Sequence, residues 1–259
     1  MSADGISAHG ELERRRGEDG EYVSKSRAVI IDNIPFQPDL KKLARKLRVK
    51  EGSRYEGQLS ALVAEAREVA KPRAMYRVAF VDGRHEASVV IDGIRFESRV
   101  LRVNLDGTHR VFPYAATCGH ELYEWMKTQD DMLLSYYADV ISETALRHAT
   151  AALESHLARR FRLGRTSTMA PGSLPDWPIR QQRPLFDLLG DPEKDIGIQL
   201  TDSMLMIPSK SISGIRFPVE KTFESCQLCP RDNCPSRQAP YDEGLYERRY
   251  HVEKHPEHG

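Results

Sequence analysis

Apolar positions recur along the chain at two different periods, and the change of period predicts an α+β fold. Spacings of three and four residues predict helices, whereas alternation of apolar and polar side chains predicts strands. The helical pattern occupies 38–49, 56–72, 119–128, 130–164 and 181–189. The strand pattern occupies 27–36, 74–82, 86–93, 94–105, 109–119, 196–201 and 205–217. Because the order is not a strict βαβ alternation, we expect an α+β fold rather than a doubly wound sheet, with antiparallel strands between residues 74 and 105.

Capping and turn residues refine this pattern at several points. Asp39 is placed to cap the first helix, because a carboxylate just before a helical run accepts hydrogen bonds from its first backbone N–H groups. Pro72 ends the second helix. Gly83 and Gly93 are predicted to separate three successive strands.

Polar segments at both ends suggest how the chain is organised. Residues 1–24 are charged and contain few apolar side chains, which predicts a flexible tail. Residues 25–223 form the predicted folded domain, 224–237 a cysteine-rich metal-binding loop, and 238–259 a charged C-terminal tail.

Composition and charge exclude several classes of function. Hydrophobic residues make up 40% and charged residues 29% of the 259 residues, and the formal net charge is zero. This balance gives no general attraction to nucleic acid or to an anionic membrane. Apolar runs stay short of the roughly 20 residues that span a bilayer, and the N-terminus has no apolar core of the signal-peptide kind. We therefore expect a cytoplasmic protein with no nucleic-acid or membrane partner.

Three of the four cysteines lie in one short segment, with the spacing C-x2-C-x4-C. They are Cys226, Cys229 and Cys234. Thiolates at such spacing chelate zinc or iron, so the segment predicts a metal site, and Cys118 is the natural fourth ligand. His120 is a weaker substitute for it. The spacing alone does not choose between zinc and iron–sulfur, and the alternative is an exposed, reduced loop without metal.

Three further motifs follow one another in a recognisable order. Ala170-Pro171-Gly172 is followed by Leu200-Thr201-Asp202-Ser203, then by Met206, Pro208 and the run Ser211-Ile212-Ser213-Gly214. Residues 165–217 thereby resemble the activation domain of cobalamin-dependent methionine synthase. With its closing cysteine motif, the whole chain looks like the stand-alone form of this domain from anaerobic microbes.

The resemblance implies a fold and a role. The family domain is a single curved α+β domain with a central antiparallel sheet flanked by helices. It binds S-adenosylmethionine and docks over a corrinoid cofactor. It supports one-electron reduction of inactive cobalt(II) and its remethylation. The partner would then be a cobalamin-binding methionine synthase or another corrinoid protein, which supplies the cobalamin, with an electron donor such as ferredoxin. A one-electron role favours an iron–sulfur cluster over zinc at the cysteines.

The same resemblance implies which residues contact the cofactor. The implied cofactor-binding positions are Ala170, Pro171, Gly172, Ser173, Lys210, Ser211, Ser213 and Gly214. Backbone donors of the Pro171-Gly172 turn and the serine hydroxyls would face a polar ligand. Lys210 would meet the corrinoid periphery or would be a solvated lysine. The loop around Trp177 would line the ligand cleft or would only connect two elements, with the indole packed on the core.

Three positions depart from the family pattern and leave two hypotheses open. Ser173 replaces a tyrosine, Thr168 stands where an arginine is expected, and Arg216 replaces a second tyrosine. The first hypothesis is an accessory protein for reactivation of a corrinoid methyltransferase, in which no side chain need be a catalytic acid or base. The second is a non-catalytic module that binds a corrinoid protein, carries a structural zinc and does not bind S-adenosylmethionine.

Overall fold

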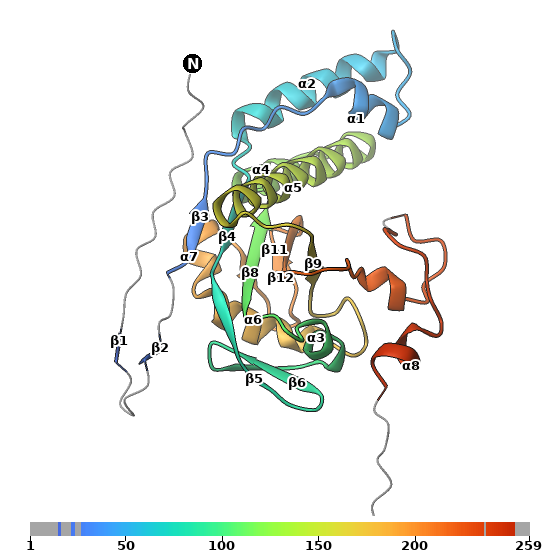
Figure 1. Ribbon diagram of the computed structural model, residues 1–259. Helices are drawn as coiled ribbons and strands as arrows, with labels where there is room; N and C mark the ends of the chain where they lie inside the picture. Colours follow the sequence, from blue (N-terminus) through green and yellow to red (C-terminus); the bar gives the residue numbers. More distant parts are fainter. Residues whose placement is uncertain (1–14, 17–21, 24–26, 236, 252–259) are drawn as a thin grey trace, which may run out of the picture. The chain divides into compact units, whose positions relative to one another are not determined.

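Helices and antiparallel strands are mixed along the chain in the computed structural model, which describes residues 15–16, 22–23, 27–235 and 237–251 (Figure 1). The α-helices are α1 (Leu40–Lys46), α2 (Arg54–Val69), α3 (Arg99–Asn104), α4 (His120–Lys127), α5 (Met132–Phe161), α6 (Gln182–Leu189), α7 (Pro192–Ile196) and α8 (Leu245–Arg249), with 3-10 turns η1 (Ile179–Gln181) and η2 (Ser225–Leu228). The strands are β1 (Arg15–Arg16), β2 (Tyr22–Val23), β3 (Val29–Ile31), β4 (Arg73–Tyr76), β5 (Ala79–Arg84), β6 (Ser88–Ile91), β7 (Ile94–Glu97), β8 (Arg110–Thr117), β9 (Thr166–Met169), β10 (Gln199–Leu200), β11 (Met206–Ile207) and β12 (Ser211–Pro218).

Side-chain caps fix where several helices begin. Asp39 accepts a 3.0 Å hydrogen bond from the backbone N–H of Lys42, so the predicted cap of α1 is confirmed. Asp131 does the same for α5, accepting from the backbone N–H groups of Leu133 and Leu134. These contacts satisfy donors that have no partner inside the helix, which stabilises each helix start.

The chain divides into two compact units, each built from three separate stretches. Among the described residues, the first unit comprises those up to 78, 113–163 and 189–213. The second comprises 79–112, 164–188 and the described residues from 214 onward. Strands β8 and β12 each contribute residues to both units.

The first unit is a layer of helices with a small antiparallel sheet. Helix α2 packs against α1, α4 and α5 (Figure 1). Strand β4 pairs antiparallel with β3 and with the second half of β8. The helices share one apolar cluster, which includes Leu59, Leu62, Leu122, Tyr137 and Ile141. Burial of these side chains at helical spacing explains why the sequence pattern located the helices.

The second unit is built on short antiparallel strands. Strands β6 and β7 form a hairpin through Asp92 and Gly93, which both have positive φ (44° and 77°). Two positive φ values in a two-residue loop match the right-handed twist of the strands, and Asp-Gly is a favoured sequence for such a loop. Strand β6 also pairs with β5, and β9 pairs with the second half of β12.

The predicted strand over residues 94–105 is wrong in its second half. Only Ile94–Glu97 is extended, and Arg99–Asn104 forms helix α3. The hydroxyl of Ser98 accepts a 3.0 Å hydrogen bond from the backbone N–H of Leu101, so this serine caps a helix that the alternating pattern concealed.

Two smaller expectations are also wrong. Gly83 does not separate two strands but lies within β5, at a register shift opposite β6. A glycine at such an irregularity bends the strand without steric cost. The strand predicted over 196–201 shrinks to Gln199–Leu200, because Pro192–Ile196 forms the short helix α7.

The predicted α+β class with antiparallel strands is confirmed. Most of the predicted N-terminal tail lies outside the described residues, as do residues 252–259 of the C-terminal tail. The described part of the latter contains helix α8 and the fully buried Tyr250. Across the described residues, no helix is both long and apolar enough to cross a membrane.

Candidate functional site

The loop that follows β9 closes on itself. The backbone N–H of Gly172 donates a 2.7 Å hydrogen bond to the carbonyl of Trp177. Gly172 has φ +80°, and a Cβ there would lie 2.8 Å from Cδ1 of Ile179. Only glycine fits this position without strain, because both the backbone conformation and the space exclude a side chain. The Ser173 hydroxyl donates to the carbonyl of Ala170 at 2.6 Å and is therefore used within the loop.

The same loop is anchored on the start of α3. The Asp176 carboxylate accepts hydrogen bonds from the Ser98 hydroxyl and, at 3.0 Å, from the backbone N–H of Val100. Trp177 is fully buried and packs edge-on against Phe96, with ring centroids 6.1 Å apart. The indole therefore packs on the core, and the lining of a ligand cleft by this loop stays a prediction. Because the loop is fixed by both contacts, the backbone of Ala170–Ser173 is a preorganised surface.

The Lys210–Ser211 pair, the next part of the implied cofactor site, makes internal contacts. The Lys210 ammonium lies 2.9 Å from the Asp139 carboxylate and its side chain is 24% exposed, so it is not a solvated lysine. The backbone N–H of Cys118 donates to the carbonyl of Lys210 at 3.0 Å. The Ser211 hydroxyl donates to Oγ1 of Thr117 at 2.9 Å in a buried position. These contacts fix the start of β12 against the end of β8.

The implied cofactor residues are distributed over both compact units. Lys210, Ser211 and Ser213 belong to the first unit, whereas residues 170–173 and Gly214 belong to the second. Ser213 and Gly214 are both buried in β12. The role of the eight positions in binding a cofactor stays a prediction.

The three clustered cysteines lie on a loop that is organised by one arginine. The Arg237 guanidinium donates to the carbonyls of Cys226 (3.1 Å), Cys229 (3.3 Å) and Arg231. The backbone N–H of Gln238 donates to Sγ of Cys226 at 3.4 Å. All three cysteines are free and half-buried. The guanidinium therefore ties three carbonyls of the loop together, and one backbone N–H is aimed at a cysteine sulfur.

Cys118 has a different environment. It is fully buried in the apolar cluster of the first unit, and its thiol faces the carbonyl of Gly119 at 3.5 Å. Burial raises the pKa of the Cys118 thiol to about 12, so it is neutral at physiological pH. His120, the weaker substitute, has a largely exposed ring near Glu124.

No group of three or more Cys, His, Asp or Glu side chains is arranged to hold a metal ion in the described ranges. The four-cysteine ligand set stays a prediction.

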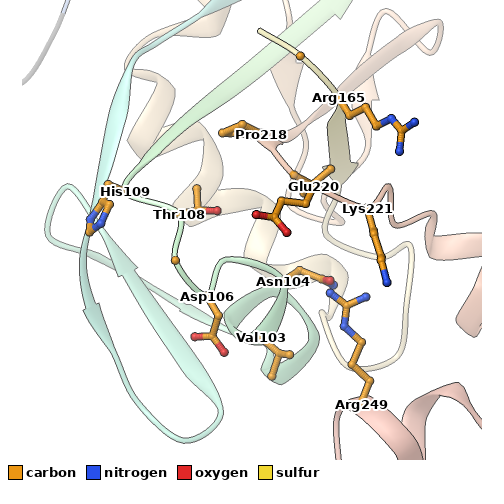
Figure 2. Close-up of a pocket in the computed structure, with 13 residues that line it drawn as sticks. Val103, Asn104, Asp106, Thr108, His109, Arg165, Pro218, Glu220, Lys221 and Arg249 are labelled. Carbon is orange, nitrogen blue, oxygen red and sulfur yellow. The ribbon is translucent and has the colours of Figure 1, made fainter.

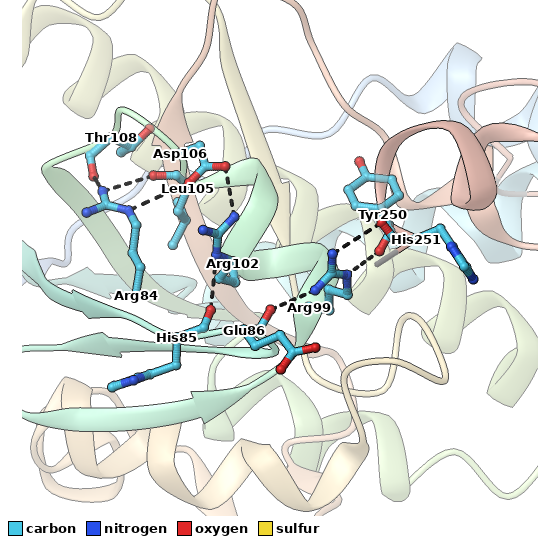
Figure 3. Close-up of polar contacts among 10 residues, drawn as sticks. All are labelled: Arg84, His85, Glu86, Arg99, Arg102, Leu105, Asp106, Thr108, Tyr250 and His251. Carbon is cyan, nitrogen blue, oxygen red and sulfur yellow. Dashed lines mark hydrogen bonds and ion pairs between the residues drawn. The ribbon is translucent and has the colours of Figure 1, made fainter. Parts of the chain in front are cut away.

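We did not identify from the sequence the residues that hold helix α8 and the two residues after it in place. Tyr250 is fully buried, and its hydroxyl donates to Oδ1 of Asn104 at 3.2 Å. The Arg99 guanidinium donates to the carbonyls of Tyr250 and His251 at the end of α8 (Figure 3). A cation at this position also interacts favourably with the negative end of the helix dipole. The available signal was the pair Tyr246 and Tyr250, four residues apart in an otherwise charged segment.

Residues 147–234 match the family described as the activation domain of vitamin B12 dependent methionine synthase. The resemblance of residues 165–217 to this activation domain is confirmed, whereas the stand-alone form with a closing cysteine motif stays a prediction. The matched segment is less than half of the chain, and it includes the loop after β9, strand β12 and the three cysteines.

Among the solved structures that are similar to this chain is one that aligns with most of it. It is described as the MetH reactivation domain bound to AdoHcy; it shares 15% sequence identity and superposes with a TM-score of 0.50. The alignment covers 77% of this chain and 82% of that one. At this identity the likeness shows a common fold over most of the chain. No curated protein sequence matches the chain.

Proposed function

We propose that the chain is an accessory protein for reductive reactivation and remethylation of a corrinoid methyltransferase, foremost a cobalamin-dependent methionine synthase. The observation that carries the proposal is the family match over residues 147–234, which contains the preorganised loop after β9. A cytoplasmic location is part of the proposal, because reduced cysteines and low-valent cobalt require a reducing compartment.

The proposed task of the protein is positioning rather than acid–base chemistry. The corrinoid on the partner supplies the cobalt, and S-adenosylmethionine supplies the methyl group. The fixed turn would orient the donor through its shape and its carbonyl groups, because Pro171 has no N–H and the N–H of Gly172 already donates to Trp177. Ser173 and Lys210 already have partners inside the protein, so a ligand would have to compete with Ala170 and Asp139 for them.

The three clustered cysteines are the proposed metal ligands, for an iron–sulfur centre or for zinc. The Arg237 contacts hold the loop in shape, and the N–H aimed at Sγ of Cys226 is the kind of outer contact that supports a metal-ligating sulfur. Cys118 fits poorly, because a buried neutral thiol in an apolar cluster would have to lose its proton. We therefore propose the three cysteines alone as the protein ligands. If an iron–sulfur cluster is bound there, it would supply one-electron transfer from a donor such as ferredoxin to the cobalt(II) of the corrinoid partner.

A reconstituted reactivation assay tests the function. A corrinoid methyltransferase without its own activation domain is prepared as cobalt(II) and mixed anaerobically with the chain, S-adenosylmethionine and a one-electron reductant. The expected result is loss of the cobalt(II) absorption and return of methyl-transfer activity. Replacing S-adenosylmethionine with S-adenosylhomocysteine, which has no methyl group to give, is the matched control. No gain over the mixture without the chain would reject the proposal.

A second candidate is a donor-free binding module with a structural zinc. It is favoured by Ser173, whose hydroxyl bonds to Ala170 where the family has a ligand-contacting tyrosine. Calorimetric titration with S-adenosylmethionine separates the two candidates, since only the first predicts saturable binding. Metal analysis of anaerobically purified protein then separates an electron carrier, with iron and sulfide, from a zinc-stapled fold.

A further inference from the structure

Three basic residues from distant parts of the sequence line one pocket of about 870 Å³ in the second compact unit (Figure 2). Arg165 precedes β9, Lys221 follows β12, and Arg249 lies in α8. Strands β9 and β12 are paired, and the backbone N–H of Val219 donates to the carbonyl of Arg165 at 3.0 Å. The sheet therefore fixes the backbone that carries Arg165 and Lys221.

Arg249 is held in the pocket wall by its neighbour. Tyr250 is fully buried, and its ring lies 5.5 Å from the Arg249 guanidinium. Figure 2 shows the Lys221 ammonium and the Arg249 guanidinium pointing toward one another. Two like charges that converge in this way repel each other, and an anion between them would remove the repulsion.

The acidic residues of the pocket do not neutralise these cations. Within the described part of the chain, Arg165, Lys221 and Arg249 make no ion pair. Asp106 is engaged by Arg102 at 3.0 Å. Glu220 lines the pocket as well, but its carboxylate is turned to the opposite side from Lys221 (Figure 2). The pocket thus carries uncompensated positive charge along one wall.

We propose that this pocket binds a phosphate-bearing small molecule through Lys221 and Arg249, with Arg165 at its rim. A guanidinium offers paired donors that match phosphate oxygens, and a lysine adds a mobile charge. The Thr108 hydroxyl on the opposite wall is a further hydrogen-bonding group. The volume lies in the range of pockets that hold ligands of nucleotide size. The site is distinct from the loop after β9 and does not depend on the corrinoid role.

Titration calorimetry with inorganic pyrophosphate and with ADP tests the proposal on the full chain. The expected result is saturable binding of at least one probe, weakened on the order of tenfold by Lys221→Gln and by Arg249→Gln. Lys50→Gln, an exposed lysine outside the pocket, is the matched control and should leave binding unchanged. Tighter binding of ADP than of pyrophosphate would identify a nucleotide, and equal binding would identify the phosphate groups alone.

A charge reversal makes the test sharper. Lys221→Glu places a carboxylate beside Arg249, so the free protein should melt at a higher temperature while its response to either probe disappears. Lys221 is exposed, so this variant is expected to fold. The proposal would be overturned by the absence of saturable binding, or by equal binding in the wild type and Lys221→Gln.

Discussion

The backbone N–H of Gly172 donates a 2.7 Å hydrogen bond to the carbonyl of Trp177, and this contact closes the loop that carries the Ala-Pro-Gly motif. The indole of Trp177 is fully buried, so the turn is tied directly to the core of its unit. The Ala-Pro-Gly motif therefore stabilises the fold, whatever its part in ligand binding. A structural role predicts that mutation lowers the free energy of unfolding, whereas a binding role predicts that mutation weakens ligand affinity.

Gly172→Ala is expected to destabilise the protein by about 1–3 kcal/mol, because the residue has positive φ and its Cβ would collide with Ile179. Urea unfolding measures the change. Gly57→Ala in helix α2 is the matched control: it meets no atom within 4 Å and should stabilise by about 0.4–1 kcal/mol. Equal stability of Gly172→Ala and the wild type would contradict this account of the turn.

Tyr250 is expected to hold the C-terminal segment to its unit. Tyr250→Phe leaves Oδ1 of Asn104 without its buried donor and should cost about 1–2 kcal/mol in the free energy of unfolding. Tyr250→Ala should cost about 3–5 kcal/mol and expose the cysteine segment to proteolysis. Tyr241→Phe, at a half-exposed tyrosine, is the control and should change stability by less than about 0.5 kcal/mol. Matching losses in the two Tyr→Phe variants would refute this anchor.

Cys118 is expected to differ from the other cysteines in reactivity. At pH 8 its thiol is protonated and buried, so iodoacetamide should label Cys226, Cys229 and Cys234 while sparing Cys118 in the folded, metal-free protein. Peptide mass analysis after a timed pulse identifies the labelled positions. Labelling of Cys118 at the rate of the other three would show that it is not buried in this way.

The same residue predicts a dependence of stability on alkaline pH. The pKa of Cys118 is raised from its ordinary 9.0 to about 12, so above pH 9 the unfolded chain loses the proton while the native protein retains it. The free energy of unfolding should therefore fall between pH 9 and 12, by at most about 1.4 kcal/mol per pH unit from this group. Tyr76, whose pKa is also raised to about 12, contributes in the same direction. Cys118→Ala should flatten the pH dependence measured by urea unfolding, and an unchanged slope would argue against the raised pKa.

Arg237 is expected to support the proposed metal ligands. A lysine cannot reproduce the planar set of donors that reaches the carbonyls of Cys226, Cys229 and Arg231, so Arg237→Lys should weaken metal binding on the order of tenfold. Competition with a chelator measures the affinity. Arg231→Ala, which keeps the backbone carbonyl, is the control. The same metal affinity for Arg237→Lys and the wild type would show that Arg237 does not support the metal ligands.

Local sequence patterns predicted several helices, one helix cap and the family resemblance of this protein. Apolar spacing located the long helices α2 and α5, Asp39 marked the start of α1, and the order of short motifs identified the family resemblance. These features depend on residues within a few positions of one another, and their chemistry can be read from the chain directly.

Other features were decided only by the tertiary structure. Ser98 begins a helix where the pattern suggested a strand, and the Asp176 that bonds to it is 78 residues away. Tyr250 is buried against Asn104 across 146 residues, and Lys221 and Arg249 share a pocket wall through two different elements. The physical reason is common to all of them: burial, pKa and the neutralisation of charge depend on neighbours in space. Such neighbours are set when the segments pack, and no local pattern in the sequence contains them.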